Sequence, residues 1–359
     1  MSVGNEARAQ QGDRGPLVVA ISSRALFDLE EENQVFETGS APTANQKPPP
    51  DLPPGVKKDA AYMQLQLERL DVPAKPLAPT RRTALKLGLG AGYAAATLPI
   101  MAQTAIKTSA EGLTAGEVMI DVAGFKMPAY RAQPAGKTGL PVILVLSEIF
   151  GVHEYIADTA RRFAKAGYLA IAPDLYARQG VPSKYTEIAK LQAEVVSKVP
   201  DAQVIADLDG AVKWARANGG NTKKVGITGF CWGGRITWLY AEQSPNVGAG
   251  VAWYGRLVGN ASALTPKHPV DLAASLKAPV LGLYGGQDGG IPLTTVNQMK
   301  DALADAGAKG NKAAQASEFV VYPAAPHAFH ADYRPSYRKD AAEDGWARAL
   351  EWFKAHGVK

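Results

Sequence analysis

Strand-like and helix-like stretches alternate along this chain from residue 117 to residue 355, and this alternation limits the possible folds more than any other feature. Short apolar runs rich in β-branched residues, such as Pro141–Leu146 and Pro279–Tyr284, are typical of buried strands. Stretches with helical spacing lie between such runs, for example His153–Ala166, and another, Asp340–Ala355, closes the chain. Alternating strands and helices predict an α/β fold, with a mostly parallel central sheet and helices on both faces.

Further stretches fit the same pattern. Strands are also expected at Glu117–Val122, Lys126–Arg131, Tyr168–Ala172, Lys224–Gly229, Gly248–Trp253 and Phe319–Tyr322. Helices are also expected at Tyr185–Val199, Ala202–Asn218, Trp232–Glu242 and Leu293–Ala306. Ligands of such sheets bind at the carboxyl ends of the strands. The residues that directly follow the strands are therefore the candidates for a functional site.

The first 80 residues have a composition that does not fit a folded domain. They hold ten of the 25 prolines of the chain and have few large apolar side chains in the stretch from residue 41 to residue 54. Such a segment cannot bury enough apolar surface to offset the conformational entropy lost on folding. We expect residues 1–80 to be mostly disordered.

Residues 81–105 have the pattern of an export signal. Arg81 and Arg82 lead into an apolar stretch that is rich in Ala, Gly and Leu and contains no acidic residue. The arginine pair resembles a twin-arginine signal, although Ala84 stands where that signal prefers a bulky apolar residue. A membrane-spanning helix is the alternative interpretation. Because a signal normally begins a chain, Met63 is an alternative start, and we expect a periplasmic protein, with a cytoplasmic one as the alternative.

Composition excludes several classes of function. The net charge of +5 is mild and the Lys and Arg residues are scattered, so nucleic acid is not expected as a partner. The single cysteine excludes an intramolecular disulfide and a zinc site built on two or more cysteines. No metal or organic cofactor is expected. Any histidine-dependent chemistry must use one of the five histidines of the chain.

Residues 229–234 read Gly-Phe-Cys-Trp-Gly-Gly and lie between an expected strand and an expected helix. A glycine–x–nucleophile–x–glycine sequence at this place is typical of a tight turn that presents a nucleophile, here Cys231. Side chains at Gly229 and Gly233 would collide with the neighbouring strand and helix. The helix N-terminus favours a thiolate, and the amide of Trp232 points to where an oxyanion would form. The alternative, a buried apolar cysteine, is common for a free cysteine outside such a turn.

An acid and then a histidine follow such a nucleophile in chain order. Asp288 and His327 each come shortly after an expected strand, so we assign them as the orienting acid and the base. Asp271 precedes its strand and Asp174 precedes the nucleophile, so neither fits this order. The other histidines are interpreted as follows: His153 and His330 near the site, His268 as structural and His356 at the surface.

Four motifs in this order resemble the dienelactone hydrolase family, whose members have the α/β-hydrolase fold. They are residues 147–152 (Ser-Glu-Ile-Phe-Gly-Val), 229–234, 286–288 (Gly-Gln-Asp) and 326–329 (Pro-His-Ala-Phe). The resemblance implies an α/β-hydrolase domain at residues 111–359 and a catalytic triad of Cys231, Asp288 and His327.

The resemblance also implies roles for residues around the nucleophile. The amides of Ile149 and Trp232 would form the oxyanion hole. Glu148 would pair with a resting thiol that stays largely neutral until a substrate carboxylate displaces Glu148 and helps to ionise Cys231. A buried glutamate is costly to leave unpaired, which agrees with this role. The alternative is that Glu148 only caps the following helix.

The sequence departs from the family where a substrate carboxylate should be bound. The family uses arginines, one of them shortly after the triad histidine, but the fourth residue after His327 is Ala331. An arginine can bind a carboxylate through two hydrogen bonds, so Arg256, Arg334 and Arg338 are candidates, each of which could instead be a surface charge. The expected apolar walls of the substrate site are Trp232, Tyr254 and Phe329.

These features predict an exported hydrolase that cleaves a small-molecule lactone or carboxylic ester. The alternatives are a broad carboxylesterase or thioesterase on the same scaffold, and a hydrolase homologue that binds a ligand without turnover. The export machinery would be a transient partner. The sequence does not indicate an oligomeric state.

Overall fold

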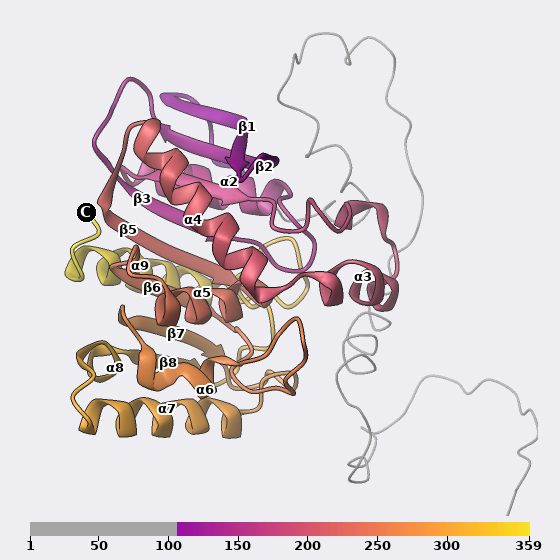
Figure 1. Cartoon of the computed structure of the whole chain (residues 1–359), viewed down its shortest axis with the longest axis vertical. Coiled ribbons are helices and arrows are strands. Elements are labelled where there is room, and N and C mark those ends of the chain that lie inside the picture. Colours follow the sequence, from indigo (N-terminus) through magenta and orange to yellow (C-terminus); the bar gives the residue numbers. More distant parts are fainter. Residues whose placement is uncertain (1–105) are drawn as a thin grey trace, which may run out of the picture. The chain divides into compact units, whose positions relative to one another are not determined.

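The computed structural model describes residues 106–359, which form one mixed sheet with helices on both faces (Figure 1). The strands lie in the order β1-β2-β4-β3-β5-β6-β7-β8. The pairs β1–β2 and β2–β4 are antiparallel, and every pair from β4 to β8 is parallel. The expected α/β-hydrolase architecture is confirmed.

The elements have the following bounds. The strands are β1 (Leu113–Val122), β2 (Phe125–Pro134), β3 (Leu140–Leu146), β4 (Leu169–Pro173), β5 (Gly220–Phe230), β6 (Ala249–Trp253), β7 (Val280–Gly285) and β8 (Glu318–Tyr322). The α-helices are α2 (Glu154–Lys165), α3 (Ile188–Glu194), α4 (Asp201–Ala217), α5 (Trp232–Gln243), α6 (Pro269–Leu272), α7 (Leu293–Ala308), α8 (Lys312–Ala316) and α9 (Lys339–Ala355).

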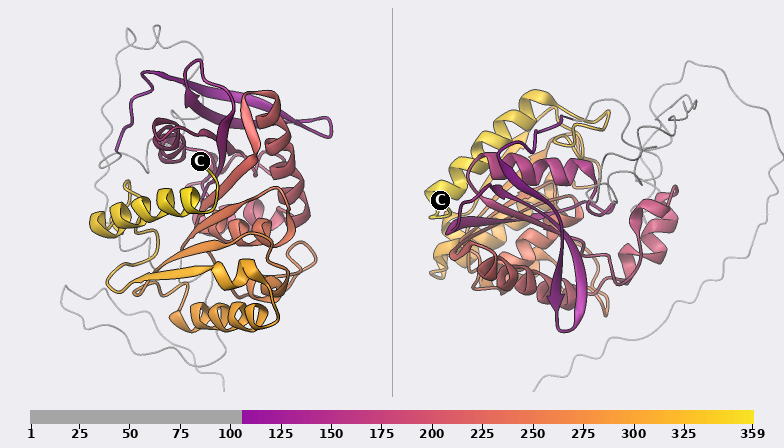
Figure 2. Two further views of the ribbon diagram at one scale, coloured as in Figure 1. Left: turned by 90° about the vertical axis from the view of Figure 1, so that its left-hand side faces the viewer. Right: turned by 90° about the horizontal axis from the view of Figure 1, so that it is seen from above.

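Helices cover both faces of the sheet (Figures 1 and 2). On one face α2 packs against α9, where the ring of Phe163 lies 4.5 Å from that of Trp346, centroid to centroid. On the other face α4 and α5 lie side by side and are joined by Tyr240, whose hydroxyl donates to Asp209 at 2.7 Å. The strands β4, β6 and β7 are buried throughout and β3 is buried from Val142, which explains why their sequences are continuous apolar runs rather than alternating ones.

One expected helix is wrong in its extent. The stretch Tyr185–Val199 is not continuous, because α3 ends at Glu194 and a short 3₁₀ turn, Val196–Lys198, follows it. Val195 leaves the helical region with φ −120° and ψ −66°. Pro200 disfavours helical angles at the residue before it, so the chain turns there and α4 begins anew at Asp201. The short helices α6 and α8 were not expected, since four or five residues carry no readable periodicity.

The described chain begins earlier than the expected domain start at residue 111. The amide of Ile106 donates to Asp332 at 3.2 Å, and that of Thr108 donates to Asp158. Arg162 bonds both of these carboxylates, Asp158 at 2.6 Å and Asp332 at 2.7 Å. Residues 106–110 are thus tied to α2 and to the loop that follows β8.

The expected disordered region 1–80, the signal segment 81–105 and the alternative start at Met63 lie outside the described residues. Within residues 106–359, none of the helices combines the length and the apolar character that a membrane crossing requires.

We predict that a protein beginning at residue 111 is less stable than one beginning at residue 106. Removing residues 106–110 leaves two buried carboxylates, Asp158 and Asp332, with one amide donor fewer each. A lost donor to a buried polar group costs about 1–3 kcal/mol, which corresponds to a fall in Tm of about 5 °C for a domain of this size. Thermal unfolding followed by circular dichroism measures the difference, and equal Tm values would contradict it.

Candidate active site

The residues assigned to catalysis lie together at the carboxyl edge of the sheet. Cys231 directly follows β5, Asp288 follows β7 and His327 follows β8. Glu148 follows β3, which is the neighbour of β5. The sheet order therefore brings together side chains that lie up to 179 residues apart in the sequence.

Cys231 occupies a strained turn between β5 and α5. Its backbone has φ 54° and ψ −110°, and it stands at the N-cap of α5. Its amide donates to the carbonyl of Trp253 at the end of β6, at 3.0 Å, which fixes the turn to the neighbouring strand. Two further site residues, Tyr254 and Ala328, also have positive φ, 38° and 59°. Such strained backbone angles are typical of functional sites.

Glycines make this turn possible. A Cβ at Gly229 would lie 2.2 Å from the carbonyl oxygen of Gly233, and a Cβ at Gly233 would lie 2.6 Å from the carbonyl oxygens of Leu146 and Ser147. Real Cβ atoms do not approach backbone this closely, so both positions require glycine. The collision expected from the sequence is confirmed, and it is with backbone that has no room to move.

Asp288 and His327 form a short hydrogen bond. Oδ2 of Asp288 lies 2.6 Å from Nδ1 of His327. The other oxygen, Oδ1, accepts from the amides of Gly290 at 2.9 Å and Ile291 at 3.1 Å. The loop after β7 thus holds the carboxylate in place. Because a carboxylate accepts and does not donate, the proton of this bond is on Nδ1, and Nε2 of His327 is left for the nucleophile.

The surroundings of His327 favour its charged form. Burial opposes the charge, but the negative charges of Asp288 and Cys231 together raise the pKa of His327 to about 10. Nε2 is buried and has no hydrogen-bond partner among residues 106–359. A positive imidazole next to a cysteine favours the thiolate, which is the reactive form.

Two backbone amides next to the nucleophile are free. Neither Ile149 nor Trp232 donates its amide to any acceptor in the described part of the chain. Trp232 is the first residue of α5, where the amides of a helix have no partner within the helix. These two amides are the ones expected to bind an oxyanion.

Glu148 is buried, and its hydrogen bonds differ from the pairing implied by the family. The side chain is 1% exposed, and Oε1 accepts from the hydroxyl of Tyr333 at 3.0 Å. Oε2 lies 3.1 Å from Nε2 of His153. Burial opposes ionisation, but the charge and hydrogen bond of His153 lower the pKa of Glu148 below its ordinary value, with a contribution from Arg334. Both carboxylate oxygens thus have donors other than the thiol of Cys231.

A layer of aromatic residues lies behind these groups. The hydroxyl of Tyr155 is 2.6 Å from Nδ1 of His330, and the ring of His330 lies 4.3 Å from that of Trp253. Burial and the nearby charge of Arg162 lower the pKa of His330 to about 3, so this imidazole is neutral and accepts the bond from Tyr155. The expected positions of His153 and His330 near the site agree with this arrangement.

The three candidate arginines differ in position. The guanidinium of Arg334 lies over the ring of Phe150, 5.5 Å from its centroid, and is close enough to Glu148 and Tyr254 to act on both electrostatically. Arg338 is exposed and donates to the carbonyls of Pro335 and Tyr337 in its own loop. Arg256 is exposed and lies near His268.

The expected apolar walls also differ in exposure. Trp232 is partly exposed, and its ring lies 4.8 Å from that of Tyr176. Tyr254 is buried, with its ring 5.1 Å from that of His327, and Phe329 lies behind it with centroids 5.3 Å apart. The hydroxyls of Tyr176 and Tyr254 are buried and have no partner among the described residues.

Three tyrosines of the site were not expected from the sequence. Tyr176 follows the end of β4, a position that could have indicated it. Tyr155 lies inside α2 and Tyr333 inside an irregular loop, where the sequence carries no comparable signal.

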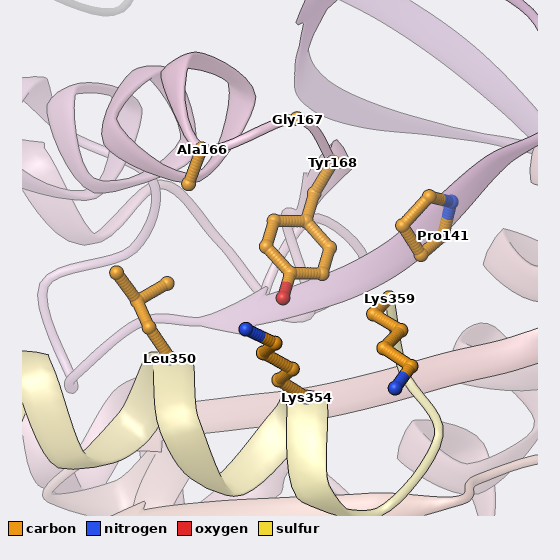
Figure 3. Close-up of a pocket in the computed structure, with 7 residues that line it drawn as sticks. All are labelled: Pro141, Ala166, Gly167, Tyr168, Leu350, Lys354 and Lys359. Carbon is orange, nitrogen blue, oxygen red and sulfur yellow. The ribbon is translucent and has the colours of Figure 1, made fainter.

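A cavity of about 340 Å³ lies at the other edge of the sheet (Figure 3). Its lining includes Pro141 near the start of β3, Gly167 and Tyr168 before β4, and Lys354 and Lys359 near the C-terminus. None of the candidate catalytic residues contributes to it.

Fold and site together define an α/β-hydrolase, with a nucleophile turn, a histidine and an acid in the required order. A model of the dienelactone hydrolase family matches residues 127–357. The chain belongs to this family and is a hydrolase.

Similar proteins agree. A Methylorubrum extorquens protein named “Putative carboxymethylenebutenolidase” is 59% identical over 280 residues, which are 78% of this chain and 94% of that protein. An Escherichia coli K12 protein of the same name is 53% identical over 269 residues, 75% of this chain and 96% of that protein. A crystal structure titled “Putative Dienelactone Hydrolase”, from Klebsiella pneumoniae, is 56% identical, with a TM-score of 0.65, and covers 67% of this chain and 98% of its own.

We predict that His330 makes the protein sensitive to acid. In the folded protein the pKa of His330 is about 3, whereas the ordinary value is 6.5. Below pH 6.5 this histidine therefore binds a proton in the unfolded state but not in the folded state. Stability is therefore lost as the pH falls from 6.5 towards 3, by about 1.4 kcal/mol per unit. We expect the free energy of unfolding, measured with urea, to fall between pH 7.5 and pH 5.0 in both proteins. The fall should be about 2 kcal/mol smaller for His330→Asn than for the wild type. The matched control is His356→Asn, at the partly exposed end of α9, and an equal loss in wild type and His330→Asn would contradict the prediction.

Proposed function

We propose that this hydrolase cleaves a small-molecule lactone or carboxylic ester, with Cys231 as nucleophile, His327 as acid and base, and Asp288 as the orienting group. The observation that carries the proposal is the 2.6 Å bond between Nδ1 of His327 and Oδ2 of Asp288, on an imidazole whose buried Nε2 is free beside Cys231. Its chemistry is that of a nucleophile activated by an adjacent charged histidine.

In the first half-reaction the thiolate of Cys231 attacks the carbonyl carbon. The carbonyl oxygen becomes an oxyanion, which the free amides of Ile149 and Trp232 bind. The intermediate then expels the alkoxide, which for a lactone is the ring oxygen. That oxygen takes the proton from Nε2 of His327, and a thioester remains on the enzyme.

In the second half-reaction His327 acts as a base. A thioester sulfur carries no charge, so the interaction that helped to raise the pKa of His327 is lost once Cys231 is acylated. Neutral Nε2 takes a proton from water as the water oxygen attacks the thioester carbonyl. Collapse of this second intermediate releases the carboxylic acid and restores the thiolate.

Arg334 is the arginine best placed to bind a carboxylate of the substrate. It is held at the edge of the site by Phe150 and acts on Glu148 and Tyr254, whereas Arg338 bonds carbonyls of its own loop. Tyr254 lies beside His327, with Phe329 behind it, and its buried hydroxyl has no hydrogen-bond partner among residues 106–359. Arg256 is exposed and lies near His268, so it is the second candidate.

We also propose that residues 81–105 direct export to the periplasm. The arginine pair before an apolar stretch supports this. In the full chain, Arg81→Lys together with Arg82→Lys should leave the protein inside the cell, as measured by fractionation and immunoblotting of a host with a twin-arginine system. Unaltered export of this variant would contradict the proposal.

Cys231→Ala should abolish hydrolysis in a protein that stays folded. The expected loss in kcat/KM exceeds about a thousandfold, because no other group of the site can form the thioester. The measurement is steady-state kinetics on a dienelactone, which carries a carboxylate, and on p-nitrophenyl acetate, which does not. A Cys231→Ala protein with the thermal stability of the wild type and substantial activity would overturn the assignment.

The same two substrates test the role of Arg334. Arg334→Gln should raise KM for the dienelactone about tenfold and leave p-nitrophenyl acetate nearly unchanged, since only the first substrate has a carboxylate. Arg338→Gln is the matched control from the same loop and should change neither. An equal effect of Arg334→Gln on both substrates would contradict the carboxylate role.

A further inference from the structure

Glu148 poses a problem for a cysteine nucleophile. It follows β3, and the turn of Cys231 packs against the end of this strand, where a Cβ at Gly233 would lie 2.6 Å from the carbonyl oxygen of Ser147. Glu148 and Cys231 both act electrostatically on the buried hydroxyls of Tyr176 and Tyr254, so the two groups lie in the same part of the site. A carboxylate free to turn towards the sulfur would accept a hydrogen bond from the thiol, and its charge would disfavour the thiolate.

The structure gives this carboxylate two other donors. Tyr333 donates its hydroxyl to Oε1 at 3.0 Å, and Nε2 of His153 donates to Oε2 at 3.1 Å. Both donors are themselves buried, with exposures of 6% for Tyr333 and 3% for His153. A carboxylate only accepts, so both partners must donate, and each oxygen then has a donor that is not the thiol.

Packing fixes both donors in place. His153 is the N-cap of α2, and its ring lies 5.1 Å from that of Tyr333 in an edge-on arrangement and 5.9 Å from that of Tyr155 in a stacked one. Tyr155 is in turn bonded to His330 in the core. The ionisable groups around Glu148 that share this space are His153, Tyr155, Tyr176, Cys231, Tyr254, Tyr333 and Arg334.

We propose that His153 and Tyr333 are positioning residues that hold the carboxylate of Glu148 away from the thiol of Cys231. The nucleophile is then a thiolate paired with His327 in the free enzyme, before any substrate binds. Esters and lactones without a carboxylate are therefore hydrolysed without a trigger, and a substrate carboxylate contributes to binding rather than to activation. This proposal rests on Cys231 being the nucleophile of the proposed function.

The test is the rate at which iodoacetamide alkylates the free enzyme between pH 5 and pH 9. Iodoacetamide is neutral and reacts with thiolates, and Cys231 is the single cysteine of the chain, so the rate reports one residue. In the wild type the rate should be nearly constant from pH 6 to pH 9. A rate that rises about tenfold per pH unit up to pH 8, as for an ordinary thiol, would contradict a thiolate in the free enzyme, whereas the proposed function would still stand if Cys231→Ala abolished hydrolysis.

Variants separate the positioning role from the nucleophile itself. Tyr333→Phe keeps the ring and removes the donor to Oε1, and His153→Leu removes the donor to Oε2. In each, the freed carboxylate should turn to the thiol, lower the alkylation rate at pH 6 about tenfold and make the rate depend on pH. The kcat for p-nitrophenyl acetate should fall by a similar factor. Tyr337→Phe removes a hydroxyl from the same loop and is the matched control.

Glu148→Gln distinguishes positioning from a general structural effect. In a Glu148→Gln background no carboxylate remains to be released, so adding Tyr333→Phe should change the alkylation rate less than about twofold. An equal loss with and without Glu148 would overturn the proposal. The proposal would also be overturned if both Tyr333→Phe and His153→Leu kept the pH profile of the wild type. In that case a reactive thiol in the wild type would still support the proposed function. If His153→Leu does not fold, the test can still be made with Tyr333→Phe, which changes the shape of the side chain very little.

Discussion

The close approach of backbone around Cys231 is the constraint on which the site depends. Gly229 and Gly233 let the turn after β5 touch both its own helix and the end of β3, with no space for a Cβ at either position. This contact forces Cys231 to φ 54° and fixes its amide to the carbonyl of Trp253. Because the strain is confined to a turn held by neighbouring strands, the fold sustains it, and the amide of Trp232 is left free next to the sulfur.

Hydrogen-bond donors from several segments hold the charged groups of this site in place. Both carboxylates are buried. Asp288 is held by amides of its own loop and by His327, and Glu148 is held by His153 at the N-cap of α2 and by Tyr333 in the loop after β8. Buried charges without partners would be strongly destabilising. The same donors that stabilise the two carboxylates also determine where each negative charge points, and hence which group the sulfur of Cys231 meets.

The sequence predicts the fold and the chain-order pattern of the site well, for physical reasons. Buried parallel strands are continuous apolar runs, and the turn at Cys231 needs glycines at fixed positions, so both leave a mark on the sequence. Val195 shows where this fails, because a helical pattern does not reveal a break that a following proline and local packing produce.

The hydrogen-bond partners of Glu148 cannot be predicted from the sequence, for a related reason. Tyr333 lies 185 residues away from Glu148, in a loop with no periodicity, and its contact follows from the sheet order. His153 was expected near the site, but the sequence could not tell which of its neighbours it bonds. The resemblance to a family supplied a pairing of Glu148 with the thiol, and the side chains of this chain give the carboxylate different donors.

A thioester on Cys231 during hydrolysis can be trapped and identified. The enzyme would be mixed with p-nitrophenyl acetate, quenched in acid within milliseconds, and digested for mass spectrometry. We expect an acetyl group on the peptide that contains Cys231, formed and lost at rates that match turnover. Turnover with no acetyl group on that peptide, or with the group on another residue, would contradict this expectation.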